Sequence, residues 1–181
     1  MAQAKLKVIL LRATPDSDEL VALGARLCYA KADLDALQEK VESSDQRAFV
    51  ERVMQRGHLS VTEHASFTFA VEGVSRALLA QLTRHRIASF SVQSQRYVSM
   101  ADGFDYVIPP AIEALGGDAK QEFIRQMETM HAWYCVWQEK LGGARESANE
   151  DARFVLPNAA ATRLVMTMNA RELMHFFSLR C

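Results

Sequence analysis

The sequence predicts an α+β fold: a single compact domain with a central sheet flanked by helices. Three observations predict it. Segments that alternate apolar and polar residues occur beside longer segments with helical spacing. The chain of 181 residues is 49% hydrophobic with a formal net charge of −1, which is typical of an ordinary folded domain. It contains only 8 glycines and 4 prolines, which excludes a disordered or collagen-like chain.

The N-terminal third is predicted to form one strand followed by two helices. Residues 6–11 are a short aliphatic run with β-branched side chains, which predicts a buried strand. Residues 19–30 place leucines on one face, and Asp16 stands where an N-cap would begin that amphipathic helix. Residues 44–56 predict a second helix, capped by its first serine and ended by Gly57.

The middle of the chain changes between the two periods. Residues 66–71 alternate large apolar residues with small ones, which predicts a half-buried strand ended by Gly73. Residues 75–83 return to helical spacing. Residues 85–100 are rich in serine and glutamine and have no sustained period, so we expect a loop held by its polar side chains.

The C-terminal part is predicted to be helical. Residues 118–141 carry the longest helical pattern of the chain, and a pair of glycines ends it. Residues 150–181 are rich in aliphatic and aromatic side chains. They predict one or two further helices, interrupted near Pro157 and Asn169.

A dense basic and polar segment begins where the predicted helix over residues 75–83 ends. Arg84, His85 and Arg86 follow one another, and positive groups this close repel unless an anion lies between them. A solvated basic turn would have the same sequence, so both interpretations stay open for these three residues alone. The stretch that follows, SFSVQSQR, offers hydroxyls and amides that suit the edge of a nucleobase or a flavin.

Other patterns argue against several kinds of site. His58, Glu63 and His64 match neither of the zinc-protease spacings, and no two cysteines are spaced as in a structural zinc site, so we expect no metal. The glycine-rich phosphate loops of Rossmann and P-loop proteins do not occur in the sequence. The three cysteines have no motif that marks a nucleophile, which indicates buried or incidental thiols.

A second group of polar residues lies near the end of the chain. Arg171 and His175 are four residues apart, so a helix would place them on one face, shortly after Asn169. A surface helix would look the same, and this pattern alone does not separate the two interpretations.

Together these segments resemble one enzyme family. Arg84-His85-Arg86, seven residues and then Ser94 form the R-H-R-x7-S signature of the flavin-dependent thymidylate synthases. The segments GHLSVTEHASFTFAVEGVSRALLAQLTRHR and ARFVLPNAAATRLVMTMNARELMHFFSLR are similar to the same family, and the similarity covers residues 5–181. It implies conversion of deoxyuridine monophosphate (dUMP) to dTMP, with carbon from 5,10-methylenetetrahydrofolate and hydride from FAD that NADPH has reduced. It implies no cysteine nucleophile.

The resemblance also implies which residues bind the ligands. The residues expected to hold FAD are His58, Ser60, Arg84, His85, Arg86, Asn169, Arg171 and His175. Those expected to hold dUMP are Gln81, Arg84, Gln93, Ser94, Gln95, Arg96, Arg153 and Arg180. Arg96 and Arg153 are expected opposite the 5′-phosphate, and Arg180 is the expected catalytic residue that favours ionisation of uracil at N3. The family usually has Glu or Gln where Val92 stands here.

The resemblance implies a homotetramer with active sites between subunits. Because the family continues beyond Leu179-Arg180 into further helix, we expect residues 1–181 to form one domain that lacks this extension. The alternative function is a truncated or diverged paralogue that binds FAD and nucleotide without turnover. The short apolar run near the N-terminus and the near-neutral charge favour a cytoplasmic protein without a membrane or nucleic-acid partner.

Overall fold

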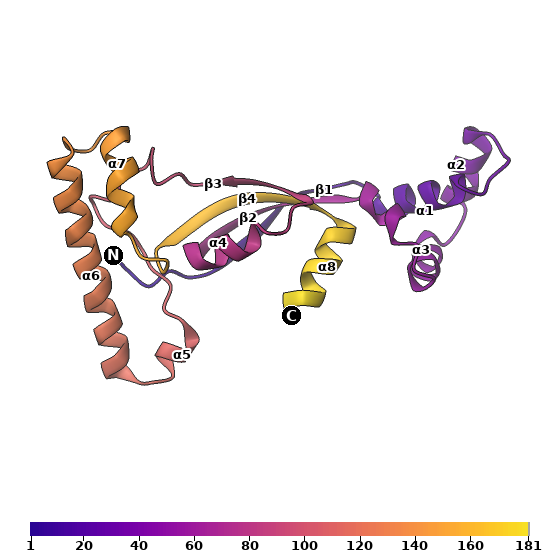
Figure 1. The fold of residues 1–181 in the computed structure, drawn as a ribbon. Coiled ribbons are helices and arrows are strands. Elements are labelled where there is room, and N and C mark those ends of the chain that lie inside the picture. The colour runs from indigo at the N-terminus through magenta and orange to yellow at the C-terminus, as the bar shows by residue number, and fades with distance from the viewer. Residues whose placement is uncertain (181) are drawn as a thin grey trace. The chain divides into compact units, whose positions relative to one another are not determined.

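The chain contains a four-stranded antiparallel sheet as well as helices, which confirms the α+β class (Figure 1). The computed structural model describes residues 1–180. The strands lie in the order β1-β2-β4-β3, so β1 and β3 are the edges of the sheet. Their bounds are β1 Lys7–Ala13, β2 Ser66–Ser75, β3 Ala88–Val92 and β4 Ala161–Asn169.

Helices account for most of the remaining described residues. The α-helices are α1 Ser17–Leu27, α2 Leu34–Glu42, α3 Gln46–Gln55, α4 Arg76–Leu82, α5 Pro110–Glu113, α6 Gly117–Lys140, α7 Glu146–Ala152 and α8 Ala170–Arg180. Two 3-10 helices, η1 Leu59–His64 and η2 Arg153–Val155, complete the set. The long helix expected over residues 118–141 is confirmed as α6.

The described chain divides into two compact units. The first unit contains residues 1–9, 70–84 and 90–165, and the second contains residues 10–69, 85–89 and 166–180. Each strand of the sheet therefore has residues that belong to both units.

The N-terminal strand was predicted at the right place but with the wrong burial. All seven residues of β1 are exposed, including Val8 at 56% and Leu10 at 54%. Because β1 is an edge strand, it has a paired neighbour on one side only, and no described segment buries its aliphatic side chains. The hydrophobic pattern of residues 6–11 reflects a strand whose faces are open in the single chain.

Two strands were missed by the sequence analysis. The segment predicted as helix after Pro157 contains β4, whose Thr162, Leu164, Met166 and Met168 are buried at every second position. The abundance of methionine and leucine hid this period of two, because both residues are also good helix formers. β3 lies inside the expected polar loop and extends into a pairing in which the backbone N–H of Gln93 donates to the carbonyl of Arg163 over 3.0 Å.

Several predicted element ends were also wrong. Asp16 has φ 44° and makes no capping hydrogen bond, and α3 is capped by Asp45, whose carboxylate accepts from the backbone of Ala48. α2 was not predicted at all.

β2 runs through Gly73, which has φ +75°, and a side chain there would lie 2.0 Å from the carbonyl oxygen of Lys5. Gly73 therefore serves a close approach of two backbones, not the end of a strand.

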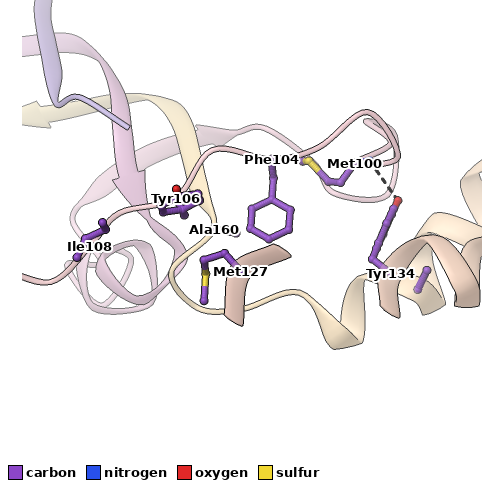
Figure 2. Packing of buried hydrophobic residues seen from close by; sticks show 8 residues of the cluster. Met100, Phe104, Tyr106, Ile108, Met127, Tyr134 and Ala160 are labelled. Carbon is purple, nitrogen blue, oxygen red and sulfur yellow. Dashed lines mark hydrogen bonds between the residues drawn. The ribbon is translucent and has the colours of Figure 1, made fainter. Parts of the chain in front are cut away.

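The core of the first unit lies between α6 and the segment that follows β3 (Figure 2). Phe104 points from this segment toward Met127 on α6, and Tyr106 and Ile108 of the same segment belong to the same buried cluster. The core of the second unit consists of Val21, Ala22, Val41, Val50 and Ala65, from α1, α2, α3 and the residue between η1 and β2. Each unit therefore has its own apolar core.

Tyr134 carries the main polar anchor of the first core. Its side chain is fully buried, and its hydroxyl donates to Oδ1 of Asn149 over 3.2 Å and accepts from the backbone N–H of Met100 over 3.2 Å. Gln138 lies one turn further along α6 and donates to the same hydroxyl. The tyrosine thereby joins α6 to α7 and to the segment beyond β3.

We expect Tyr134→Phe to lower the free energy of unfolding by about 1–3 kcal/mol, because the ring still fills the core while buried donors lose their acceptor. Urea unfolding followed by circular dichroism measures this difference. Tyr29→Phe is the matched control, because Tyr29 is 82% exposed, and it should change stability by less than about 0.5 kcal/mol. Equal effects of the two substitutions would show that the buried hydroxyl contributes nothing.

Candidate ligand-binding sites

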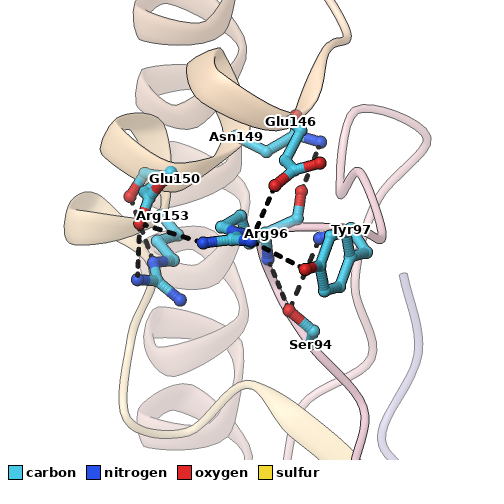
Figure 3. Close-up of polar contacts among 7 residues, drawn as sticks. All are labelled: Ser94, Arg96, Tyr97, Glu146, Asn149, Glu150 and Arg153. Carbon is cyan, nitrogen blue, oxygen red and sulfur yellow. Dashed lines mark hydrogen bonds and ion pairs between the residues drawn. The ribbon is translucent and has the colours of Figure 1, made fainter.

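Arg96 lies at the centre of a cluster of charged side chains in the first unit (Figure 3). Its guanidinium is 2.8 Å from a carboxylate oxygen of Glu146 and 3.8 Å from one of Glu150. It also donates to the hydroxyl of Tyr97 over 2.7 Å. The hydrogen bond to Tyr97 and the charge of Glu146 raise the pKa of Arg96 above its ordinary value, so the side chain stays positive at any working pH.

The turn before Arg96 is held by the signature serine. The hydroxyl oxygen of Ser94 accepts from the backbone N–H groups of Arg96, at 3.1 Å, and of Tyr97, at 3.4 Å. Because this oxygen is engaged as an acceptor, its remaining function is to donate its own hydrogen. That geometry suits a hydroxyl that binds an anion and does not suit a nucleophile.

Arg153 meets the same carboxylate as Arg96. It begins η2, directly after α7, and its guanidinium is 3.9 Å from the Glu150 oxygen that also faces Arg96. Burial, and then the nearby positive charge of Arg153, lower the pKa of Arg76. Two arginines, Arg96 and Arg153, thus share one carboxylate, and both were expected at the nucleotide phosphate. Nε of Arg96 is buried without an acceptor among the described residues, so the cluster has unused donor capacity.

The other residues expected at the nucleotide lie near this cluster in sequence but have different surroundings. Gln93 lines a cavity of about 310 Å³ together with Lys5, Glu72 and Arg163. Gln95 is half-buried between Ser94 and Arg96. Gln81, on α4, and Arg84, just after it, are exposed. Of the expected set, the described structure brings Ser94, Arg96 and Arg153 into one network and leaves the glutamines outside it.

His85 differs from the arginines on either side of it. Its side chain is buried and Nδ1 lies 2.9 Å from a carboxylate oxygen of Glu172, whereas Arg84 and Arg86 are exposed. The basic triplet is therefore not a uniformly solvated turn. Glu172 was not named by the sequence analysis, although it occupies the same helix face as Leu173 and Phe176, a pattern that indicates burial.

A larger cavity of about 640 Å³ lies in the second unit. Asn169, Arg171 and His175 line it from the end of β4 and from α8, and Glu63 on η1 forms an ion pair with Arg171. Its apolar lining comes from side chains of Leu59, Ile87 and Met174. The volume falls within the range of small-molecule sites, and a guanidinium and an amide beside apolar walls match a flat ring system that carries phosphates. These residues fit a flavin nucleotide.

Some of the other expected ligand-binding residues lie beside this cavity, and others lie apart from it. His58 and Ser60 are exposed at the start of η1, next to the lining residue Leu59. Arg180 is exposed at the end of α8. Except for Arg84, all residues expected at FAD belong to the second unit, and except for Arg180, all those expected at dUMP belong to the first.

Two further features concern residues outside these clusters. Cys135 lies 3.5 Å from Nε2 of His131, one turn earlier on α6, so one cysteine does have a histidine neighbour. That nitrogen faces the carbonyl oxygens of Met100 and Ala101, each at 3.0 Å, and must donate to them, so it is not free to act as a base. Within residues 1–180, no cluster of metal-ligating side chains occurs, and no helix is long and apolar enough to cross a membrane.

The chain is similar to proteins with known names. Residues 9–181 match the family described as thymidylate synthase complementing protein. The flavin-dependent thymidylate synthase of Geobacter sulfurreducens is 51% identical over 97% of this chain and 74% of its own length. A solved UMP/dUMP methylase from Streptomyces cacaoi, bound to 5-Br dUMP, is 28% identical with a TM-score of 0.77, covering 98% of this chain and 79% of its own. Thymidylate Synthase X from Helicobacter pylori, solved with FAD and dUMP, shares the fold at 24% identity and a TM-score of 0.71, covering 97% and 84% of the two chains.

Proposed function

Because this chain belongs to the family of flavin-dependent thymidylate synthases, we propose that it methylates dUMP at C5 to give dTMP. The proposed carbon donor is 5,10-methylenetetrahydrofolate, and FAD is the proposed cofactor. When bound and reduced by NADPH, the flavin supplies the hydride. The observation that carries the proposal is the cluster of Ser94, Arg96 and Arg153. Ser94 ends the signature and Arg96 follows it, whereas Arg153 lies in the later segment that is similar to the family.

The nucleotide phosphate is proposed to bind at this cluster. The guanidinium groups of Arg96 and Arg153 lie on either side of Glu150, so a dianionic phosphate there meets two positive charges. The hydroxyl of Ser94 donates to a phosphate oxygen, since its acceptor capacity already holds the turn. Gln81, Gln93 and Gln95 are proposed to provide amides for the rest of the nucleotide, and Arg84 is proposed to contact both the nucleotide and the flavin.

The ring chemistry is assigned to Arg180. C5 of uracil is a weak nucleophile, and negative charge on the ring after loss of the N3 proton makes it a stronger one. A guanidinium near N3 stabilises that charge without accepting the proton, because arginine stays protonated. His58, Ser60, His85, Arg86, Asn169, Arg171 and His175 are proposed to bind and orient the flavin. The cavity in the second unit supports this assignment for Asn169, Arg171 and His175.

The active enzyme is proposed to be a cytoplasmic homotetramer with active sites between subunits. Two features support it. The aliphatic side chains of β1 are exposed in the single chain, and exposed apolar patches commonly mark contact surfaces. The residues expected at FAD and at dUMP also fall almost entirely into different units of the chain, so neither unit holds a complete set.

Purification and a turnover assay test the proposal. The purified protein should be yellow, with flavin absorbance, and should release tritium from C5-labelled dUMP when given methylenetetrahydrofolate and NADPH. A colourless protein that takes up no FAD on reconstitution contradicts the proposal. Binding of both FAD and dUMP without tritium release would instead support a diverged paralogue that binds without turnover.

A further inference from the structure

The contact between His85 and Glu172 is the one buried contact between a basic and an acidic side chain among the described residues, and the proposed chemistry does not use Glu172. The side chain of His85 is 6% exposed and that of Glu172 is 10% exposed, with 2.9 Å between Nδ1 and the carboxylate oxygen. Placing a carboxylate away from water costs free energy unless it is paired. A buried pair of this kind in a functional segment points to a role beyond filling the core.

The contact fixes which ring nitrogen of His85 is available. A carboxylate only accepts hydrogen bonds, so Nδ1 carries the hydrogen and donates. Nε2 is then the nitrogen left for another partner, and none of residues 1–180 makes a hydrogen bond to it. Edge-on contact with Phe176, at 5.2 Å between ring centres, prevents the imidazole from turning freely. His175 meets the ring in the same edge-on way at 6.1 Å.

Glu172 is itself held by a residue of the proposed flavin site. Its backbone N–H donates to Oδ1 of Asn169 over 2.8 Å, which caps the start of α8. The cap fixes the first turn of α8, and with it Glu172, at the cavity that Asn169 and Glu172 both line. A single short segment thus connects the cavity, the carboxylate and the ring of His85.

We propose that Glu172 is a positioning residue for the flavin: it holds the imidazole of His85 with Nδ1–H toward the carboxylate, so that Nε2 is presented to the cofactor. This inference rests on the proposed function, because it assumes that His85 contacts FAD. Outer-sphere carboxylates have this effect on histidines elsewhere, by fixing the tautomer and the ring orientation. Glu172 also lines the cavity, so the test must separate its effect through His85 from a direct contact with the cofactor.

Two substitutions of Glu172 separate positioning from packing. Glu172→Gln keeps a side-chain oxygen that accepts from Nδ1–H, and should leave the FAD dissociation constant within about 3-fold of the unaltered protein. Glu172→Met keeps the length but has no strong acceptor, and should weaken FAD binding by about 10–100-fold. Fluorescence titration of the flavin-free protein with FAD measures both, and the visible spectrum of the bound flavin should shift only in the methionine variant. Glu128→Met, at an exposed position on α6, is the control and should bind FAD normally.

A double-substitution cycle tests whether Glu172 acts through His85. In a His85→Phe background, Glu172→Met should weaken FAD binding no further, because there is no imidazole left to position. Should Glu172→Met fail to fold, Glu172→Asp provides the comparison: its carboxylate is withdrawn by one methylene, and it should weaken FAD binding more than Glu172→Gln does.

The outcomes are distinguishable. A merely structural role predicts that these variants lower the melting temperature while leaving the FAD dissociation constant and spectrum unchanged, and that result overturns the inference. The inference is also overturned if Glu172→Met weakens FAD binding in the His85→Phe background as much as it does in the unaltered protein. If the unaltered protein binds no FAD, the proposed function itself fails and the inference fails with it. Weakened FAD binding in the methionine variant, with Glu172→Gln close to the unaltered protein, supports the inference.

Discussion

Replacing Arg96 with alanine is expected to weaken dUMP binding by about 100-fold or more, while FAD binding stays unchanged. Arg96 and Arg153 both face Glu150, and removing one guanidinium leaves a bound phosphate with half of its positive partners. Except for Arg84, the residues proposed to bind FAD belong to the other unit of the chain, so the cavity there keeps all its side chains. Isothermal titration with dUMP, and fluorescence titration with FAD, measure the two affinities separately.

Arg125→Ala is the matched control for this substitution. Arg125 is also an arginine paired with a glutamate, Glu122, but it lies on the exposed surface of α6. Its loss should change neither affinity. Unchanged dUMP binding by the Arg96 variant would contradict the assignment of the phosphate site, and a joint loss of dUMP and FAD would contradict the separation of the two sites.

Placing charge on β1 is expected to abolish assembly and, with it, more than about 99% of turnover. Val8 and Leu10 lie on the same face of the strand and are both more than half exposed in the single chain. If a second copy covers this face, Val8→Glu with Leu10→Glu would bury two unpaired carboxylates in the contact. Light scattering after size-exclusion chromatography gives the mass of the assembly, and tritium release gives the activity.

The control substitution places the same charge where no contact is expected. Leu115 is 76% exposed just after α5, and Leu115→Glu should leave both mass and activity unaltered. Circular dichroism should show that the β1 variant keeps its secondary structure, because both side chains already lie in water in the isolated chain. A β1 variant that retains the mass of the unaltered assembly would contradict this contact surface.

The fold could be predicted from the sequence wherever local signals were strong. The helical periods of α6 and of α4 are local features and were predicted correctly. β4 was missed because its partner β2 lies far away in sequence, as the hydrogen bond between the hydroxyls of Thr68 and Thr167 illustrates. Its residues alone do not distinguish a buried strand from a buried helix. The burial of β1 was wrong because burial depends on what covers a strand, and composition does not report that.

The candidate sites could likewise be predicted only in part from the sequence. The signature around Arg84 and Ser94 pointed to the nucleotide and flavin residues through the resemblance, before any geometry was known. The sequence did not reveal that carboxylates of the same chain contact the basic side chains of these sites. Glu150 contacts Arg96, and Glu172 contacts His85. Such partners come from distant segments and carry no motif of their own. Only the folded chain brings them to the arginines and the histidine.

At the proposed phosphate site, the carboxylates around Arg96 would make nucleotide binding an exchange of one anion for another. In the single chain, Glu146 and Glu150 already provide the negative charge that a phosphate would bring. An incoming nucleotide must compete with them, and a dianion at the centre of the cluster attracts the guanidinium groups more strongly than one carboxylate does. A nucleoside without phosphate cannot make this exchange and leaves the internal pairs in place. If the nucleotide phosphate binds at this cluster as proposed, the cluster selects nucleotides over nucleosides by their charge.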